Sequence, residues 1–332
     1  MNLQLTGQTV AVMGAARGIG RAMVTAFAGE GCRVCGFDRA EPAELAAGGK
    51  AGGVEATRAD AVPVAGGAAR PTGRIAGASD ATLAGGATGA GGATRADGAS
   101  SLGGGEVARA DAGSSADAAA WPAGATFVRG DATKLDEVAR FAEACGETDH
   151  LVFCIGAGSG KAGSPFWNLS PADWPRVLEL NLVSAVNAAH AFAPNFVRRR
   201  RGSLLFLVSV AGQTGSPTDP PYSAAKAGLI NFVHCAARDF AAYGVRVNAL
   251  SPGMVKTDLN QSVWEALQRT LPPAERRDYA TWAEEKIRRI SPLGRWQTAE
   301  ECAALAAFIA SDHARSITGQ TLNVDGGQVM HA

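Results

Sequence analysis

Short segments rich in β-branched and aromatic residues alternate with longer helical segments along most of this chain. The first pair is a strand-like T-V-A-V-M at 9–13 followed by a helical stretch from Gly18 to Gly29. Strands that alternate with helices pair in parallel, because each helix returns the chain to the start of the next strand by a right-handed crossover. The sequence therefore predicts an α/β fold, a doubly wound parallel sheet with helices on both faces.

The same pattern places the remaining elements. Strands are expected at 33–37, 126–129, 150–154, 203–208, 246–250 and 321–324. Helices are expected at 135–144, 171–197, 222–242 and 299–310, with a short one ending near Leu45.

Composition changes abruptly near Ala46 and changes back near Trp121. The residues between them include runs such as G-G-A-T-G-A-G-G-A-T and almost no large apolar side chains. Such a segment cannot bury enough surface to offset the entropy of ordering it. We predict that 46–120 is a flexible, low-complexity Ala/Gly-rich insertion. Without it the chain has the size of one ordinary α/β domain, so 1–332 is expected to be a single domain that the insertion interrupts.

Charge and hydropathy exclude several classes of partner. The formal net charge is +0, which provides no electrostatic basis for binding nucleic acid or an anionic membrane. Apolar runs such as Leu204 to Val208 have the length of strands, and 1–8 lacks the pattern of a signal peptide. We therefore expect a cytoplasmic protein that acts on a small molecule.

Metal or disulfide chemistry is not expected. Cys32 and Cys35 form a C-x-x-C, but they lie in a strand-like segment, where positions three apart point to opposite faces. No second cysteine pair or spaced histidine pair accompanies them. We interpret these cysteines as core thiols.

A glycine-rich turn follows the first strand. The run G-A-A-R-G-I-G at 14–20 contains Gly14, Gly18 and Gly20, and it opens the first helix. Glycines there permit a tight turn and close approach of the backbone to a pyrophosphate, which rests at the helix N-terminus. The placement between a strand and a helix predicts a dinucleotide site, which would also involve Arg17 and Ile19.

The second strand ends at Asp38, about 20 residues after the glycines. A carboxylate at this position accepts hydrogen bonds from the adenosine ribose hydroxyls and repels a 2′-phosphate, so Asp38 favours NAD. Arg17 and Arg39 leave NADP open, because either cation could reach a 2′-phosphate.

Tyr222 and Lys226 are four residues apart on a predicted helix and therefore share one face. An ammonium close to a phenol favours the phenolate, which would lower a pKa that is ordinarily about 10. The pair is then a candidate proton donor and acceptor. Ser209 lies upstream in the same run.

These features together resemble the classical short-chain dehydrogenases/reductases. The resemblance rests on G-A-A-R-G-I-G, Asn181, Ser209, Tyr222, Lys226, Pro252-Gly253 and the ending T-G-Q-T-L-N-V-D-G-G, and it covers the chain outside 46–120. It implies a Rossmann-type sheet of seven parallel strands and a nicotinamide cofactor. It also implies a homotetramer or homodimer, assembled through the helices expected at 171–197 and 222–242.

The resemblance assigns roles to individual residues. Tyr222 is implied to be the general acid/base, Lys226 to lower its pKa and bind the nicotinamide ribose, and Ser209 to hydrogen-bond the reacting oxygen. Asn181 is implied to hold a proton-relay water. Further cofactor contacts are implied for Asp131, Ala132, Gly156, Pro252, Gly253, Val255 and Thr257.

Two departures from the family pattern stand out. Phe153, Cys154 and Ile155 precede Gly156 where the family commonly has N-N-A before the glycine, and Met13 replaces a threonine. Only the backbone approach at Gly156 is then expected to remain, without the usual side-chain hydrogen bonds.

The segment from Asp258 to Ile290 is expected to cover the substrate. Its apolar residues either line a pocket or pack on the core. Its arginines, at 269, 276, 277, 288 and 289, either receive a carboxylate or phosphate or lie in water.

The leading interpretation is an NAD-dependent oxidoreductase that interconverts a secondary alcohol and a ketone. An NADPH-dependent reductase of 3-oxoacyl thioesters is the alternative, and a dinucleotide-binding sensor without turnover is a third possibility of another class.

Overall fold

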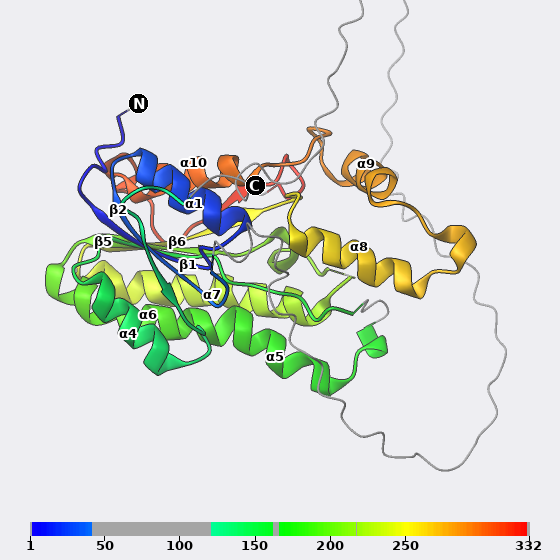
Figure 1. Cartoon of the computed structure of the whole chain (residues 1–332), viewed down its shortest axis with the longest axis horizontal. Helices are drawn as coiled ribbons and strands as arrows, with labels where there is room; N and C mark the ends of the chain where they lie inside the picture. The colour runs from blue at the N-terminus through cyan, green and yellow to red at the C-terminus, as the bar shows by residue number, and fades with distance from the viewer. Residues whose placement is uncertain (1, 42–120, 162–165, 217, 331–332) are drawn as a thin grey trace, which may run out of the picture. The chain divides into compact units, whose positions relative to one another are not determined.

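Seven parallel strands form one sheet in the order β3-β2-β1-β4-β5-β6-β7 (Figure 1). The computed structural model describes residues 2–41, 121–161, 166–216 and 218–330. The sheet confirms the predicted fold class, a doubly wound α/β architecture. The segment 46–120 and the short helix expected near Leu45 lie outside the described residues.

The bounds of the elements are as follows. The strands are β1 (Thr9–Met13), β2 (Arg33–Asp38), β3 (Thr126–Arg129), β4 (His150–Phe153), β5 (Gly202–Leu207), β6 (Val245–Pro252) and β7 (Thr321–Val324). The α-helices are α1 (Gly18–Gly29), α4 (Leu135–Cys145), α5 (Trp174–Leu178), α6 (Ser184–Arg199), α7 (Pro220–Ala241), α8 (Asp258–Thr270), α9 (Tyr279–Ile290) and α10 (Ala299–Ala310).

Local sequence explains several helix ends. Thr298 and Glu301 form a capping box at the start of α10, in which each side chain accepts a hydrogen bond from the other residue's backbone. The helix α4 stops at Gly146, whose φ of 66° is left-handed and suits a residue without Cβ.

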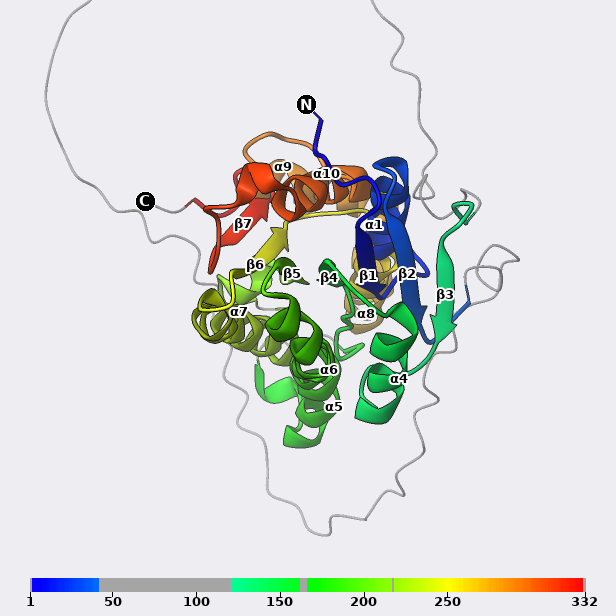
Figure 2. The ribbon, with the colours of Figure 1, turned by 90° about the vertical axis from the view of Figure 1, so that its left-hand side faces the viewer.

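Helices cover both faces of the sheet. In Figures 1 and 2, α1 and α10 lie on one side, and α4, α6 and α7 lie on the other. The side chains of β1 alternate between these two faces. Val10 and Val12 belong to the core under α1 and α10, whereas Ala11 and Met13 belong to the core on the opposite face. Both faces of the central strands are therefore buried.

The predicted helix at 171–197 is interrupted. A 3-10 turn at Pro171–Asp173 leads into α5, a π-helical turn follows at Glu179–Val183, and α6 continues from Ser184. A π-helical turn inserts a residue into the helix and re-aims the side chains around it, and such turns concentrate at functional sites. Here the turn contains Asn181, which is fully buried.

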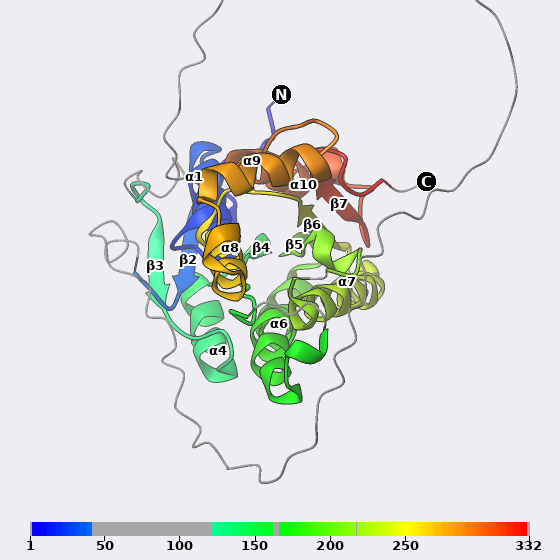
Figure 3. The same ribbon diagram turned by 90° about the vertical axis from the view of Figure 1, so that its right-hand side faces the viewer.

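Two further helices, α8 and α9, follow the carboxyl end of β6 and project from that end of the sheet (Figure 3). They form the segment expected to cover the substrate. Within the described residues, no helix is both long and apolar enough to span a bilayer. The six cysteines are free thiols, and of the two predicted core thiols Cys35 is buried whereas Cys32 is only half-buried.

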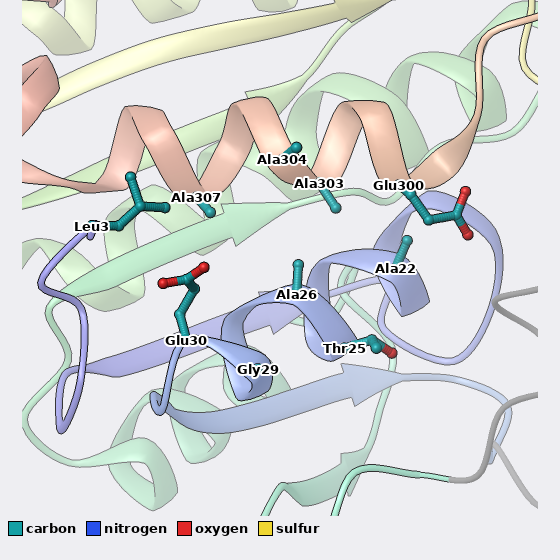
Figure 4. A pocket seen from close by; sticks show the side chains of 10 residues that line it. All are labelled: Leu3, Ala22, Thr25, Ala26, Gly29, Glu30, Glu300, Ala303, Ala304 and Ala307. Atoms are coloured by element: carbon teal, nitrogen blue, oxygen red, sulfur yellow. The ribbon is translucent and has the colours of Figure 1, made fainter. Parts of the chain in front are cut away.

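A hollow of about 610 Å³ lies between α1 and α10 (Figure 4). Alanines from both helices line it, and Glu30 and Glu300 lie near its two ends. None of the residues that the sequence places at the dinucleotide or proton-transfer site lines this hollow. Small side chains let the two helices approach closely there. We therefore interpret the hollow as a feature of how α1 and α10 pack and not as part of the predicted site.

The glycine turn provides a test of the packing between β1 and α1. A Cβ at Gly20 would lie 1.9 Å from the Gly14 carbonyl oxygen, whereas a Cβ at Gly29, at the other end of α1, meets nothing within 4 Å. We expect Gly20→Ala to lower the free energy of unfolding by about 1–3 kcal/mol, since backbone must shift to accept the methyl group. We expect Gly29→Ala to be neutral or to stabilise by up to about 1 kcal/mol. Urea denaturation measures both, and equal stability of the two variants would contradict this packing.

Candidate active site

The proposed proton-transfer residues meet at the start of α7. Asp219 caps this helix, and two prolines follow at its first positions, where a missing N–H is tolerated. Tyr222 and Lys226 lie one turn apart, and the Lys226 Nζ is 5.6 Å from the centroid of the Tyr222 ring. The structure therefore confirms that the two side chains share one face of the helix.

Lys226 is only 2% exposed, and its Nζ donates a hydrogen bond of 2.9 Å to the Leu207 carbonyl at the end of β5. Two residues later, Ser209 has an extended backbone, and its Oγ accepts from the Ala211 N–H at 3.2 Å. The Ser209 side chain also hydrogen-bonds Tyr222. The carboxyl end of β5 thus places the serine and fixes the lysine next to the phenol.

Burial dominates the acid–base properties of this pair. It raises the pKa of Tyr222 to about 12, against the hydrogen bond with Ser209, and the nearby Asp219 carboxylate adds to the increase. Burial likewise lowers the pKa of Lys226 to about 8. The expectation that the ammonium by itself brings the phenol toward neutrality is therefore wrong for the ligand-free protein, because desolvation outweighs the attraction between the charges.

The π-helical turn brings Asn181 into the same site. Its Nδ2 donates to the carbonyls of Ala157 and Val177, both at 2.8 Å. Its Oδ1 is buried and has no hydrogen-bond partner among the described residues. A Cβ at Gly156 would lie 2.8 Å from this oxygen and 3.1 Å from the Lys226 Nζ, so the amide oxygen and the ammonium face the same space beside Gly156.

The glycine turn combines left-handed backbone with close backbone packing. Gly14 and Gly18 have φ values of +83° and +53°, which side chains rarely adopt. A Cβ at Gly14 would lie 3.0 Å from the backbone of Cys154 and Ile155. Arg17 is the extended N-cap residue of α1, which has no side-chain cap, and Ile19 packs against the core. A helix N-terminus reached through such a turn favours an anionic group such as a pyrophosphate.

Asp38 ends β2 with its carboxylate turned toward this loop. Its Oδ2 accepts from the Ala16 N–H at 3.1 Å, and its Oδ1 accepts from the Arg39 N–H at 2.7 Å. The Arg39 Nε lies 3.8 Å from Asp131 Oδ2, so this arginine stands beside a carboxylate. The structure therefore places Asp38, Arg39 and Asp131 together near the glycine turn.

Asp131 itself is held by Thr133, whose N–H and hydroxyl both donate to Asp131 Oδ1. Partial burial raises its pKa, but these hydrogen bonds and the charge of Arg39 outweigh that effect and lower it. The neighbouring Ala132 is 2% exposed, and its carbonyl accepts from Asn187 of α6.

The segment after β6 also reaches the glycine turn. A Cβ at Gly18 would lie 3.7 Å from the Thr257 methyl group, which places Thr257 against the start of α1. Val255 is 7% exposed and forms a β-bridge with Gln297, whose side chain also accepts from the Met254 N–H.

Pro252 is the last residue of β6 and pairs with Val324 of β7. A Cβ at Gly253 would lie 2.7 Å from the Asp325 backbone, so only glycine fits there without a shift. The predicted cofactor residues of this segment thus border the same end of the sheet.

The residues that depart from the family pattern serve packing. Phe153 is fully buried, with its ring centroid 6.0 Å from that of Phe206. The Cys154 N–H donates to the Met13 carbonyl at 2.8 Å. The backbone after β4 packs against Gly14, and these side chains supply no amide groups, while the approach of a cofactor at Gly156 stays a prediction.

Three of the five arginines between residues 269 and 289 lie beside carboxylates. Arg277 pairs with Glu285, Arg288 pairs with Glu284, and Arg269 lies 3.5 Å from Glu265, all exposed. This arrangement favours the interpretation in which these arginines lie in water. The aromatic residues pack on one another, since Tyr279 contacts both Trp264 and Trp282.

Sequence reasoning missed three residues of this site, namely Asp219, Arg176 and Gln297. Asp219 could have been found, because an aspartate directly before two prolines is a typical N-cap. Arg176 and Gln297 act through backbone contacts with segments distant in sequence, which no local pattern reveals.

Comparisons with known proteins give a consistent result. The model of a family described as enoyl-(acyl carrier protein) reductase matches residues 99–329. A 3-oxoacyl-[acyl-carrier-protein] reductase of Synechocystis is 36% identical over 159 residues, which are 48% of this chain and 57% of that protein. Nodulation protein G of Rhizobium meliloti is 33% identical over 174 residues, 52% and 64% of the two chains. These matches span less than two thirds of the relatives' lengths.

The structure is also similar to that of the aldohexose dehydrogenase of Thermoplasma acidophilum. The TM-score is 0.67 with 21% sequence identity, and the match covers 99% of this chain and 96% of the other. At this level of identity the similarity concerns the fold.

Proposed function

Because the matching family model covers more than half of the chain, the protein belongs to the short-chain dehydrogenase/reductase family, and on that premise we propose that it interconverts a secondary alcohol and a ketone by hydride transfer. The observation that carries this proposal is the convergence of Ser209, Tyr222, Lys226 and Asn181 at one end of the sheet. A nicotinamide cofactor, when bound, accepts or supplies the hydride.

The chain supplies the cofactor's binding site. Gly14 and Gly18 allow the backbone to approach a pyrophosphate at the start of α1, and Thr257 borders the same turn. The Asp38 carboxylate, which already accepts three backbone N–H groups, would receive ribose hydroxyls and repel a 2′-phosphate. These residues fit NAD.

The proton path runs through the chain's own side chains. Ser209 orients the reacting oxygen and hydrogen-bonds Tyr222, whose hydroxyl exchanges the proton with the substrate. The ammonium of Lys226 and the unpartnered Oδ1 of Asn181 both lie beside Gly156, where Oδ1 would accept a hydrogen bond from a water that relays the proton onward. Lys226 and Asn181 are buried, whereas Ser209 and Tyr222 are half-buried and remain accessible to a substrate.

A reductase of 3-oxoacyl thioesters is a second candidate function. The observation that favours it is the similarity to the 3-oxoacyl-[acyl-carrier-protein] reductase of Synechocystis. Rates with a panel of simple secondary alcohols and with a 3-oxoacyl thioester distinguish the two, because both reactions use the same proton-transfer residues but different substrate contacts.

Assembly into a dimer or tetramer stays a prediction, and so does a cytoplasmic location. The exposed side chains of Val183, Val186 and Val197, on α6 and the turn before it, support an interface on this helix.

The central prediction concerns Tyr222. We expect Tyr222→Phe to lower kcat by about 10²–10⁴-fold, since the variant lacks the group that exchanges the proton. The affinity for the cofactor, measured by fluorescence, should change little. Tyr243→Phe is the matched control, because Tyr243 lies beyond the end of α7. Turnover of Tyr222→Phe comparable to that of the control would remove Tyr222 from its role.

Cofactor preference tests Asp38. We expect kcat/KM to be higher with NAD than with NADP, and Asp38→Ser to narrow or reverse the difference, because the repulsion of a 2′-phosphate is lost. Asp136→Ser, an exposed change in the first turn of α4, is the control. A preference of the unmodified enzyme for NADP would contradict the assignment.

A further inference from the structure

Asp219 combines burial, negative charge and contact with two separate segments near the reacting groups. It is 7% exposed at the N-terminus of α7, three residues before Tyr222. Its Oδ1 accepts from the Tyr222 N–H at 3.4 Å, and its Oδ2 accepts from the Ser159 N–H at 2.7 Å. One carboxylate therefore joins the helix that carries the phenol to the segment that follows β4.

The approach of this segment to Asp219 is very close. A Cβ at Gly158 would lie 2.4 Å from Asp219 Oδ2, so a side chain there would collide with the carboxylate. Gly158 thus has a specific role, which is to let the backbone reach Asp219.

Arg176 of α5 holds the same backbone from the other side. Its Nη2 donates to the carbonyls of Gly158 and Ser159, at 3.1 and 3.4 Å. Asn181 donates to the neighbouring Ala157 carbonyl. The residues 156–161, which begin at the glycine beside Lys226, are therefore fixed by polar groups from α5, the π-helical turn and the α7 cap.

The charges around the phenol can be stated group by group. On its own helix, Tyr222 faces the Lys226 ammonium and the Asp219 carboxylate, and from the end of β5 it faces the neutral Ser209. The exposed Arg176 is the cation that faces Asp219 from α5. Lys161, in the same segment, is paired with Asp173 at 2.6 Å.

We propose that Asp219 is a positioning residue, which clamps the segment 156–161 against the start of α7 and places a negative charge that opposes ionisation of the Tyr222 hydroxyl. This inference rests on the proposed function for the role of Tyr222. The clamp makes the substrate side of the site rigid. The negative charge of Asp219 favours the protonated phenol. A protonated phenol can donate its proton to a ketone, as the reductive direction requires.

An electrostatic role of Asp219 predicts the direction in which the pH profile shifts when its charge is removed. A purely structural role predicts no such direction. Burial raises the pKa of the Asp219 carboxyl, against its hydrogen bonds and the charge of Arg176. Asp219→Asn removes the charge and keeps the shape of the side chain. We expect the midpoint of the acidic limb of kcat for alcohol oxidation to move to lower pH, by about half a unit or more.

Arg176→Gln should move the same midpoint in the opposite direction, to higher pH, because the field of Asp219 is then less compensated. The shift should be smaller, since Arg176 is exposed and its charge is screened by solvent. This exposure also makes Arg176→Gln a variant that is expected to fold. Asp278→Asn, which changes the N-cap of α9 in the same way, is the control and should leave the midpoint unchanged.

The clamp is tested without substrate by hydrogen exchange of the full chain free of cofactor. In Asp219→Ala, the Ser159 amide should exchange about tenfold faster than in the unmodified protein, because it loses its acceptor. Unchanged exchange at Ser159 would overturn the clamp. Coincident midpoints for Asp219→Asn, Arg176→Gln and the unmodified enzyme would overturn the electrostatic role. Absence of any oxidoreductase activity in the unmodified enzyme would instead refute the proposed function, and the exchange experiment would still decide the clamp.

Discussion

The desolvation of one phenol and one ammonium on the same turn of α7 is the constraint on which the site depends. Lys226 is 2% exposed, and its ammonium is held by a backbone carbonyl of β5, with no carboxylate paired to it in the described part of the chain. Burial lowers the pKa of Lys226 to about 8, and partial burial raises that of Tyr222 to about 12. Each group is thereby shifted toward its uncharged form. In a site of low dielectric constant, any further charge changes the pKa values of both groups strongly.

The fold provides this environment by bringing backbone segments together without intervening side chains. Gly14, Gly20, Gly156 and Gly158 each occupy a place where a Cβ would lie 3.0 Å or closer to another group. Gly14 and Gly20 lie in the turn proposed to bind the dinucleotide, and the other two glycines let the segment after β4 reach Lys226, Asn181 and Asp219. The side chains that replace the usual amides after β4 pack into the core and leave these backbone approaches intact.

Much of the architecture was predictable from the sequence, and the reasons are local. β1, β3, β7, α1 and α10 have the predicted bounds, because each combines a clear apolar period with a turn or cap at its ends. The interruption of the helix at 171–197 was not predictable, since the π-helical turn at Asn181 is stabilised by contacts with Ala157, 24 residues away. The spacing of Tyr222 and Lys226 indicated that they share a face but not that Lys226 is fully buried and Tyr222 half-buried, and burial decides their pKa values. The contact of Asp219 with Ser159 joins residues 60 positions apart, so no local sequence pattern indicated it.

The most direct test of this account is to titrate the phenol of Tyr222 by NMR in protein labelled with ¹³C at the tyrosine ζ carbon, with Tyr222→Phe to assign its signal among the three tyrosines. The account predicts that Tyr222 stays protonated up to about pH 11 in the ligand-free protein, because burial raises its pKa. It also predicts that saturating NAD moves the titration at least about two units lower, because the cationic ring adds the charge to which the desolvated pair responds. A phenol that titrates near its ordinary value of about 10 without ligand, or whose titration NAD leaves unmoved, would contradict the account.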